Sequence, residues 1–230
     1  GNELARPDTI TVELYGEVTN DAGEKEKWMI GEPVPISAAN EWKWTFTGLL
    51  KNEGGKEITY SVEESKLGET GFDEGKSIIV MYDGDSLKGQ WEKSIDGYEV
   101  TNTWTKPTEE IVFEGKAEFG IKKYDGDGKV MEGVVFTIGG DDYTTDANGE
   151  IKVTVPVDNK KKEETFEYEI SEKSTREGYD LVEGAATVTV SCTSKFASAD
   201  AEKLVNTYTK TCELSEDGAE AFEWNGETGT

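Results

Sequence analysis

Histidine is absent from this sequence of 230 residues, and cysteine occurs only twice. Without histidine the chain lacks the usual general base of enzymes at neutral pH and the commonest transition-metal ligand. Cys192 and Cys212 lie far in sequence from any second metal-binding group, so the sequence predicts no zinc site and no other metal. We expect no cofactor and no enzyme with turnover.

Basic residues are also scarce, with 24 Lys and Arg against 49 Asp and Glu and a formal net charge of -25. Such a surface repels phosphate backbones and anionic headgroups, which argues against nucleic acid and membranes as partners. No apolar run reaches the length of a signal peptide or a spanning helix. Aromatic residues make up 10% of the chain, and disordered acidic chains lack that content, so we expect a folded protein.

Apolar residues recur at every second position in most segments. Ile10, Val12 and Leu14 share one face, and "EWKWTFTGL" at 41–49 shows the same spacing. Turn sequences separate these runs, among them "YDGDGK" at 124–129 and "DANGE" at 146–150, which we interpret as hairpin turns and not as calcium loops. Short alternating runs between turns predict an all-β fold of the sandwich type.

A repeat divides the chain into two copies. "VTNTWTK" at 100–106 and "LVNTYTK" at 204–210 are nearly the same, and each follows a Tyr-x-Val/Ile-x-Glu segment. We therefore predict two related sandwich domains in series, residues 1–106 and 107–210, with Pro107 in a short linker. Residues 211–230 are acidic and rich in glycine, and we interpret them as a tail or a further linker.

Three polar residues of the second copy occupy positions that the alternation reserves for apolar side chains. Lys123 continues the face of Phe119 and Ile121, Glu172 continues that of Tyr168 and Ile170, and Asn206 precedes Tyr208. Burial lowers the pKa of a lysine and raises that of a glutamate, so both tend to become neutral. The Lys123 amine can then attack the Asn206 side-chain carbonyl and expel ammonia, while Glu172 transfers the protons. The alternative is a buried polar network without a covalent bond.

These segments resemble the collagen-adhesin B-type (CnaB) domain of Gram-positive surface proteins. The first copy carries the resemblance in "RPDTITVEL", "KEITYSVEE" and "YEVTNTWT"; the second is similar to the related pilin version in "IKKYDGDGKVMEGVVFTI" and "VNTYTK". The resemblance implies transthyretin-like and immunoglobulin-like sandwiches whose first and last strands are joined by a Lys–Asn isopeptide bond. Lys123 and Asn206 match the bonded pair, and Glu172 matches the catalyst. The bond forms once, within the fold.

The first copy departs from that pattern. Glu64 and Asn102 are present, but no lysine follows the inward alternation: Lys43 faces away from its tryptophan neighbours and Lys56 falls in a turn. Family members carry the lysine on a strand before the "RPD" segment, and this sequence begins inside that loop. Three explanations stay open: the sequence is a fragment, another chain donates a lysine-bearing strand, or this copy has no cross-link.

The predicted function is that of a structural stalk module in an adhesin or pilin on the surface or cell wall of a Gram-positive bacterium, next to neighbouring domains of a longer protein. The alternative is a ligand-binding module for a carbohydrate or host matrix protein. Trp28 and Trp91, in charged surroundings, are the candidate contacts for such a ligand. Because an extracellular setting permits oxidation, Cys192 and Cys212 form either a disulfide or two free thiols.

Overall fold

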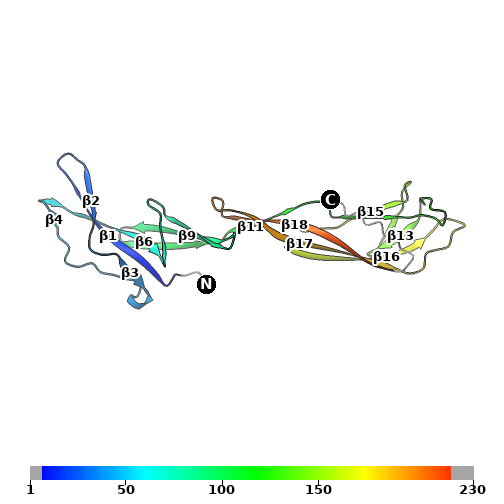
Figure 1. Cartoon of the computed structure of the whole chain (residues 1–230), viewed down its shortest axis with the longest axis horizontal. Coiled ribbons are helices and arrows are strands. Elements are labelled where there is room, and N and C mark those ends of the chain that lie inside the picture. The colour runs from blue at the N-terminus through cyan, green and yellow to red at the C-terminus, as the bar shows by residue number, and fades with distance from the viewer. Residues whose placement is uncertain (1–6, 219–230) are drawn as a thin grey trace. The chain divides into compact units, whose positions relative to one another are not determined.

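A computed structural model describes residues 7–218 of the chain (Figure 1). The chain divides into two compact units: unit 1 extends to Thr108 and includes Asp200–Leu204, and unit 2 comprises Glu109–Ala199 and the residues from Val205 onward. Among the described residues no helix is both long and apolar enough to cross a membrane. The predicted all-β sandwich fold is confirmed, since strands and turns account for nearly all of the regular structure in the described range.

Unit 1 contains one sheet of five strands, one of three strands and a small hairpin. The larger sheet has the order β2-β1-β6-β7, with β3 also paired to β1, and the smaller has the order β10-β9-β8. A single 3-10 turn, η1 (Ala38–Asn40), follows β3. The strands are β1 (Thr9–Thr19), β2 (Lys25–Met29), β3 (Val34–Ser37), β4 (Asn52–Glu53), β5 (Lys56–Glu57), β6 (Thr59–Leu67), β7 (Thr70–Gly71), β8 (Ile78–Asp83), β9 (Ser86–Asp96) and β10 (Glu99–Thr105).

Unit 2 contains a six-stranded sheet of order β11-β18-β17-β16-β13-β14 and a pair formed by β12 and β15. The strands β17 and β18 form a long hairpin, visible in Figure 1. The strands are β11 (Thr108–Phe113), β12 (Glu118–Lys122), β13 (Val135–Ile138), β14 (Asp141–Thr144), β15 (Glu150–Thr154), β16 (Glu163–Ser174), β17 (Ala186–Asp200) and β18 (Val205–Gly218).

The cores follow the period-two pattern of the strands. In unit 1, Val12 and Leu14 of β1 pack with Val62 of β6, and a second cluster surrounds Trp91. In unit 2, one cluster collects the inward residues of β12, β13, β15, β16 and β17, including Cys192. The faces predicted from alternation are therefore those that pack, and the polar residues on the same faces point into the cores.

Two segments differ from the sequence-based expectation. Residues 41–49 are irregular instead of a strand, since Trp42 adopts a left-handed backbone conformation and Trp44 stays 53% exposed. Residues 211–218 continue β18 instead of forming a tail, because Cys212 and Leu214 pack against the core of unit 2. The rest of the predicted tail, 219–230, lies outside the described residues.

Cys192 of β17 and Cys212 of β18 form a disulfide. The bond closes a segment of 20 residues, and for a loop of that size we expect a stabilisation of about 3 kcal/mol, because the cross-link restricts the unfolded chain. Chemical denaturation of unit 2 with and without reductant measures this difference. The double variant Cys192→Ala/Cys212→Ala is the control, and its midpoint should not respond to reductant. An equal midpoint for the wild type in both conditions would contradict the prediction.

Candidate cross-linking site

Lys123 and Glu172 meet inside unit 2. Lys123 follows directly after β12, and its Nζ donates to Glu172 Oε2 on β16 at 3.1 Å. The Glu172 side chain is fully buried and that of Lys123 is 14% exposed. The backbone N–H of Val182 donates to the same oxygen at 3.1 Å, whereas Oε1 of Glu172 is buried and has no hydrogen-bond partner among the described residues. The Lys123 amine and the Glu172 carboxyl group are therefore in contact, and one carboxyl oxygen has no hydrogen-bond partner among the described residues.

Asn206 is also buried, but in another part of unit 2. It is the second residue of β18 and lies four residues before Lys210, whose Nζ contacts Glu164 of β16. Both β16 and β18 are antiparallel neighbours of β17, so β16 and β18 run in the same direction. Because Lys210 lies opposite Glu164, the earlier residue Asn206 lies on the side of Glu164 that is away from Glu172. The eight positions from Glu164 to Glu172 alone span about 26 Å of strand.

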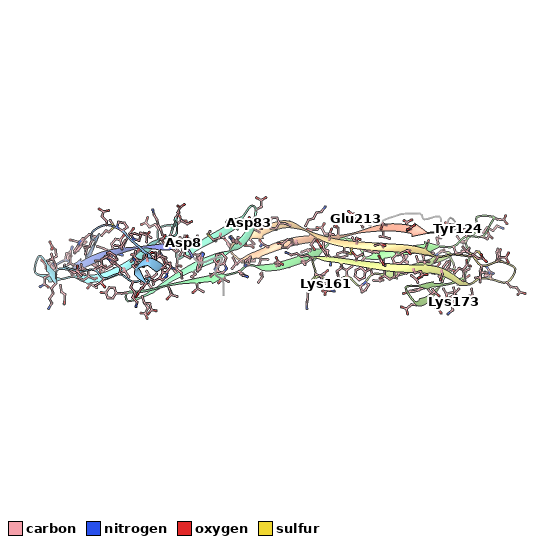
Figure 2. All side chains as sticks on the ribbon, turned by 90° about the horizontal axis from the view of Figure 1, so that it is seen from below. Asp8, Asp83, Tyr124, Lys161, Lys173 and Glu213 are labelled. Atoms are coloured by element: carbon pink, nitrogen blue, oxygen red, sulfur yellow. A yellow bond between two sulfur atoms is a disulfide. The ribbon has the colours of Figure 1, made fainter. Side chains whose placement is uncertain are left out.

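In Figure 2, Lys161, which precedes Glu164 in sequence, and Lys173, which follows Glu172, lie at different positions along unit 2. The structure thus brings Lys123 and Glu172 together and does not bring Asn206 to them. The physical reason is the length of the β17–β18 hairpin, in which alternation continues past residue 210 and the disulfide holds the register. The Lys123–Asn206 bond stays a prediction, and it requires another register of β18.

A second buried lysine was missed by the sequence analysis. Lys210 is fully buried, and its Nζ donates to Glu164 Oε2 and to the backbone carbonyls of Asp158 at 3.0 Å and Lys161 at 2.9 Å. It lies on the face that Asn206 and Tyr208 share, so one more step of the alternation would have found it. All three ammonium hydrogens have acceptors, which identifies this pair as a structural ion pair that holds the 158–162 segment to β18.

The first copy's pair, Glu64 and Asn102, also meets. Asn102 Nδ2 donates to Glu64 Oε1 at 2.9 Å across the two sheets of unit 1, and Glu64 is only 1% exposed. Burial raises the pKa of the Glu64 carboxyl, although the hydrogen bond from Asn102 and the charge of Lys93 oppose that shift. Glu64 Oε2 and Asn102 Oδ1 are buried without a hydrogen-bond partner among the described residues.

The prediction that no lysine reaches the first pair is wrong. Lys93 on β9 lies opposite Asn102 in the β9–β10 register, and its Nζ donates to the backbone carbonyl of Glu64 at 2.6 Å. The same nitrogen lies 4.0 Å from the ring centroid of Phe72. Leu87 and Trp91 are buried on the same strand at odd positions, so continued alternation would have placed Lys93 inward as well.

The two tryptophans proposed as ligand contacts have different environments. Trp91 is 9% exposed and packs against Trp104 in a tilted arrangement at a centroid distance of 5.1 Å, so it belongs to the core and does not face a ligand. Trp28 lies on β2 and is half-buried, beside a surface pocket that also includes Leu50 and Tyr60. The idea that Trp91 binds a ligand is therefore wrong.

In the turns at 124–129 and 146–150, which were considered as calcium loops, aspartate side chains accept hydrogen bonds from the turn backbone. Asp125 Oδ1 accepts the backbone N–H groups of Asp127 and Lys129, and Asp146 Oδ1 accepts those of Asn148 and Glu150. These backbone hydrogen bonds lower the pKa of both carboxyl groups. Within residues 7–218 no group of three or more potential ligand residues gathers as a metal site would require.

Comparison with known families decides the relationship. Residues 1–103 match the family model of the Cna protein B-type domain, and residues 117–203 match that of the SpaA prealbumin-like fold domain. The chain is a tandem of CnaB-type domains. The predicted family is thereby confirmed, and we refer to units 1 and 2 below as the first and second CnaB-type domains. A search of curated proteins finds no match to the chain.

The chain also matches solved structures, at low similarity. One match is a single B repeat unit (B1) of the collagen binding surface protein Cna of Staphylococcus aureus, at 17% identity over 90% of each chain with a TM-score of 0.27. Another is the pilus adhesin SpaC from Lactobacillus rhamnosus GG, at 13% identity over 91% of this chain and 27% of that chain, with a TM-score of 0.26.

The Lys210–Glu164 pair predicts a pH-dependent contribution to stability. Replacing Glu164 by Gln leaves the buried ammonium of Lys210 without a counter-ion, so we expect the free energy of unfolding of the second domain to fall by about 3 kcal/mol at pH 7. Burial raises the pKa of the Glu164 carboxyl, but hydrogen bonds from Lys210 and the Asp158 N–H outweigh this and hold the pKa below its ordinary value. The contribution is therefore complete above the ordinary pKa of glutamate and is lost as the pH falls through the folded-state pKa.

Denaturant titrations of wild type and Glu164→Gln between neutral and acidic pH measure this effect, and the difference between the two should close in acid. Glu163→Gln is the matched control, because Glu163 is the exposed neighbour on the same strand. Equal losses for Glu163→Gln and Glu164→Gln, or a difference that does not change with pH, would contradict the prediction.

Proposed function

We propose that this chain is a structural stalk module of a Gram-positive surface adhesin or pilin, located outside the cell, in which covalent cross-links between strands resist unfolding by force. The observation that carries the proposal is the contact between the buried Lys123 amine and the buried Glu172 carboxyl in the second CnaB-type domain. The matches of the two domains to the family models of the Cna protein B-type domain and the SpaA prealbumin-like fold domain support the proposal.

The chemistry proposed for the second domain uses Lys123 as nucleophile and Glu172 as proton carrier. Lys123 gives up a proton to the carboxylate, and the free amine attacks the side-chain carbonyl carbon of an asparagine. The protonated Glu172 delivers that proton to the departing nitrogen, and the carboxylate then takes the second proton from the attacking nitrogen as the amide forms. One ammonia leaves and one amide bond remains. The open Oε1 of Glu172 supports this role, because Glu64 Oε1 receives an asparagine amide in the first domain.

The acceptor in the second domain is the part of the proposal that depends on register. Asn206, predicted from the sequence, reaches Glu172 only if β18 shifts. The sequence carries another asparagine, Asn225, in the segment that follows β18 and lies outside the described residues. The proposal is a single bond from Lys123. Substitution of Asn206 and of Asn225 in turn identifies the asparagine to which Lys123 is joined.

A ligand-binding module is the second candidate function. The half-buried Trp28 and the pocket beside it favour this role, while the burial of Trp91 argues against the contact surface first expected. Collagen binding and pilus adhesion belong to the Cna and SpaC proteins named above. A host glycan or matrix protein is therefore a weaker proposal for this chain than a mechanical role.

The intact mass of the unfolded, reduced chain, followed by peptide mapping, tests the bond from Lys123. We expect a peptide that contains Lys123 to be joined to one that contains an asparagine, with the loss of one ammonia, because the amine replaces the amide nitrogen. Lys123→Arg and Glu172→Gln should each abolish the join, and Lys122→Arg should not, since Lys122 faces solvent on the same strand.

The variants Asn206→Asp and Asn225→Asp locate the acceptor, because aspartate at the acceptor position would lose water instead of ammonia or fail to react. An unlinked Lys123 peptide in the folded wild type would overturn the chemistry proposed for the second domain.

A further inference from the structure

The outer edge of β8 in the first CnaB-type domain is apolar and unpaired. β8 is an edge strand of the three-stranded sheet, whose order is β10-β9-β8, and among residues 7–218 it pairs only with β9. The segment "SIIVMY" at 77–82 contains neither a charge nor a proline. An edge of this kind presents free N–H and C=O groups to any strand that approaches it. We propose that β8 is a self-association site, at which β8 of a second copy of this chain pairs with it in the antiparallel direction.

Most other edge strands in the described part of the chain carry features that discourage such pairing. β2, β11 and β14 each contain at least two charged residues, β3 contains Pro35, and β10 consists mainly of polar residues. Charged side chains and proline on an edge oppose edge-to-edge contact. Two large apolar side chains of β8 are exposed instead, Ile78 at 43% and Tyr82 at 54%. A second strand therefore gains more apolar contact at β8 than at these edges.

The backbone of β8 determines which residues can bind a second strand. The N–H of Lys93 donates to the carbonyl of Ser77, so these two residues form a hydrogen-bonded pair of the β8–β9 ladder. Hydrogen-bonded and non-hydrogen-bonded pairs alternate along an antiparallel ladder, so the N–H and C=O groups of Ile78 and Val80 point away from β9. The ladder shifts register near its end because β9 has an extra residue there. β8 itself stays regular, and the backbone groups of Tyr82 point outward as well.

The three outward residues of β8 are arranged symmetrically about Val80. When two identical strands pair antiparallel around this position, Val80 lies opposite Val80 of the second copy and Ile78 lies opposite Tyr82. All three pairs are of the hydrogen-bonded type, and together they form about six backbone hydrogen bonds. The outer pairs join an aromatic to a β-branched side chain, a favourable combination across strands. A two-fold axis at Val80 therefore satisfies the edges of both copies at once.

Charge also favours a second copy in this register. The chain carries a formal net charge of -25, so most of its surface repels another copy. The pairing places Lys76 of each copy beside the β8–β9 turn of the other, which carries Asp83 and Asp85. These three side chains are exposed and form no salt bridge with any residue that the structure describes. Opposite charges of the two copies therefore meet at both ends of the apolar run.

The small size of this contact determines where it has an effect. Pairing of two edge strands buries less surface than a standard protein interface, so two free copies associate weakly. Copies that are held side by side in large numbers experience a high effective concentration, and weak contacts then add up. Lateral pairing of neighbouring stalks is the consequence that rests on the proposed stalk function. The pairing of β8 with β8 does not depend on that function.

Sedimentation equilibrium of the full chain over a series of concentrations tests the association. At an ionic strength of about 0.15 M, which screens charges beyond about 8 Å, we expect the average mass to rise from 25.3 kDa toward twice that value. Val80→Pro removes an outward N–H without breaking the β8–β9 ladder, so this variant should stay monomeric. Lys76→Glu should weaken the association, because like charges then meet at both ends. Lys66→Glu, at an exposed position of β6, is the matched control and should associate like the wild type.

Cysteine variants test the register. With Val80→Cys the two new thiols lie on opposite residues, whose Cα atoms are about 5.5 Å apart, a separation that a disulfide accepts. Mild oxidation should link two copies, and reductant should separate them. Ile78→Cys is the control on the same strand, because its two thiols lie about 14 Å apart along the paired strands. It should form a link only when it is mixed with Tyr82→Cys.

The proposal is overturned if Val80→Cys links no faster than Ile78→Cys alone, or if Val80→Pro associates as strongly as the wild type. A wild type that keeps the mass of one copy at every concentration also overturns it. If Val80→Pro does not fold, the cysteine variants decide. Neither readout involves Lys123, so failure of the β8 pairing is distinguishable from failure of the cross-link proposed for the second domain.

Discussion

The structure depends on one constraint: a charged side chain that enters the space between two sheets must find a partner there. Removing a lysine or a carboxylate from water costs several kcal/mol unless hydrogen bonds and an opposite charge compensate. The second domain meets the constraint with Lys123–Glu172 and with the fully enclosed Lys210–Glu164 pair. The first meets it with Glu64, whose carboxyl binds Asn102 and whose backbone oxygen binds Lys93. These pairs fix how the facing elements of each domain are aligned.

The two CnaB-type domains bury a glutamate at matching positions but give it different partners. In the second domain Lys123 contacts the Glu172 carboxylate, and Oε1 of Glu172 lacks a hydrogen-bond partner among residues 7–218. In the first domain Asn102 contacts the Glu64 carboxylate, and Lys93 donates to the backbone oxygen of Glu64. Lys210 differs from both, because its ammonium group donates to three acceptors, the Glu164 carboxylate and two backbone carbonyls. We therefore interpret Lys210 as structural, whereas the reactivity of Lys123 is a proposal.

Alternation in the sequence was sufficient to predict the sandwich fold and to place Glu64, Lys123 and Glu172 on inward faces, because a period of two is a local property of a strand. The same pattern, carried a few residues further, would have found Lys93 and Lys210. The position of Asn206 was not accessible in this way. Which residues face each other across a sheet depends on strand register and hairpin length. The similar sequences of segments 100–106 and 204–210 determine neither of these. Residues 41–49 show that alternation alone does not prove a strand. Trp42 and Phe46 alternate and pack against the core, but the segment is irregular.

The account as a whole makes a mechanical claim, and force spectroscopy on the full chain pulled from its two ends tests it most directly. The measured quantity is the length released as each domain unfolds, at about 3.5 Å per extended residue. Without reductant, we predict that the second domain releases less than its full length, because the segment closed by the bond from Lys123 and the 20-residue segment closed by the disulfide both stay unextended. The Lys123→Arg variant should regain the length held by its bond and still withhold the segment closed by the disulfide. Full release of the second domain in the wild type would contradict the claim that cross-links between strands hold this protein together under load.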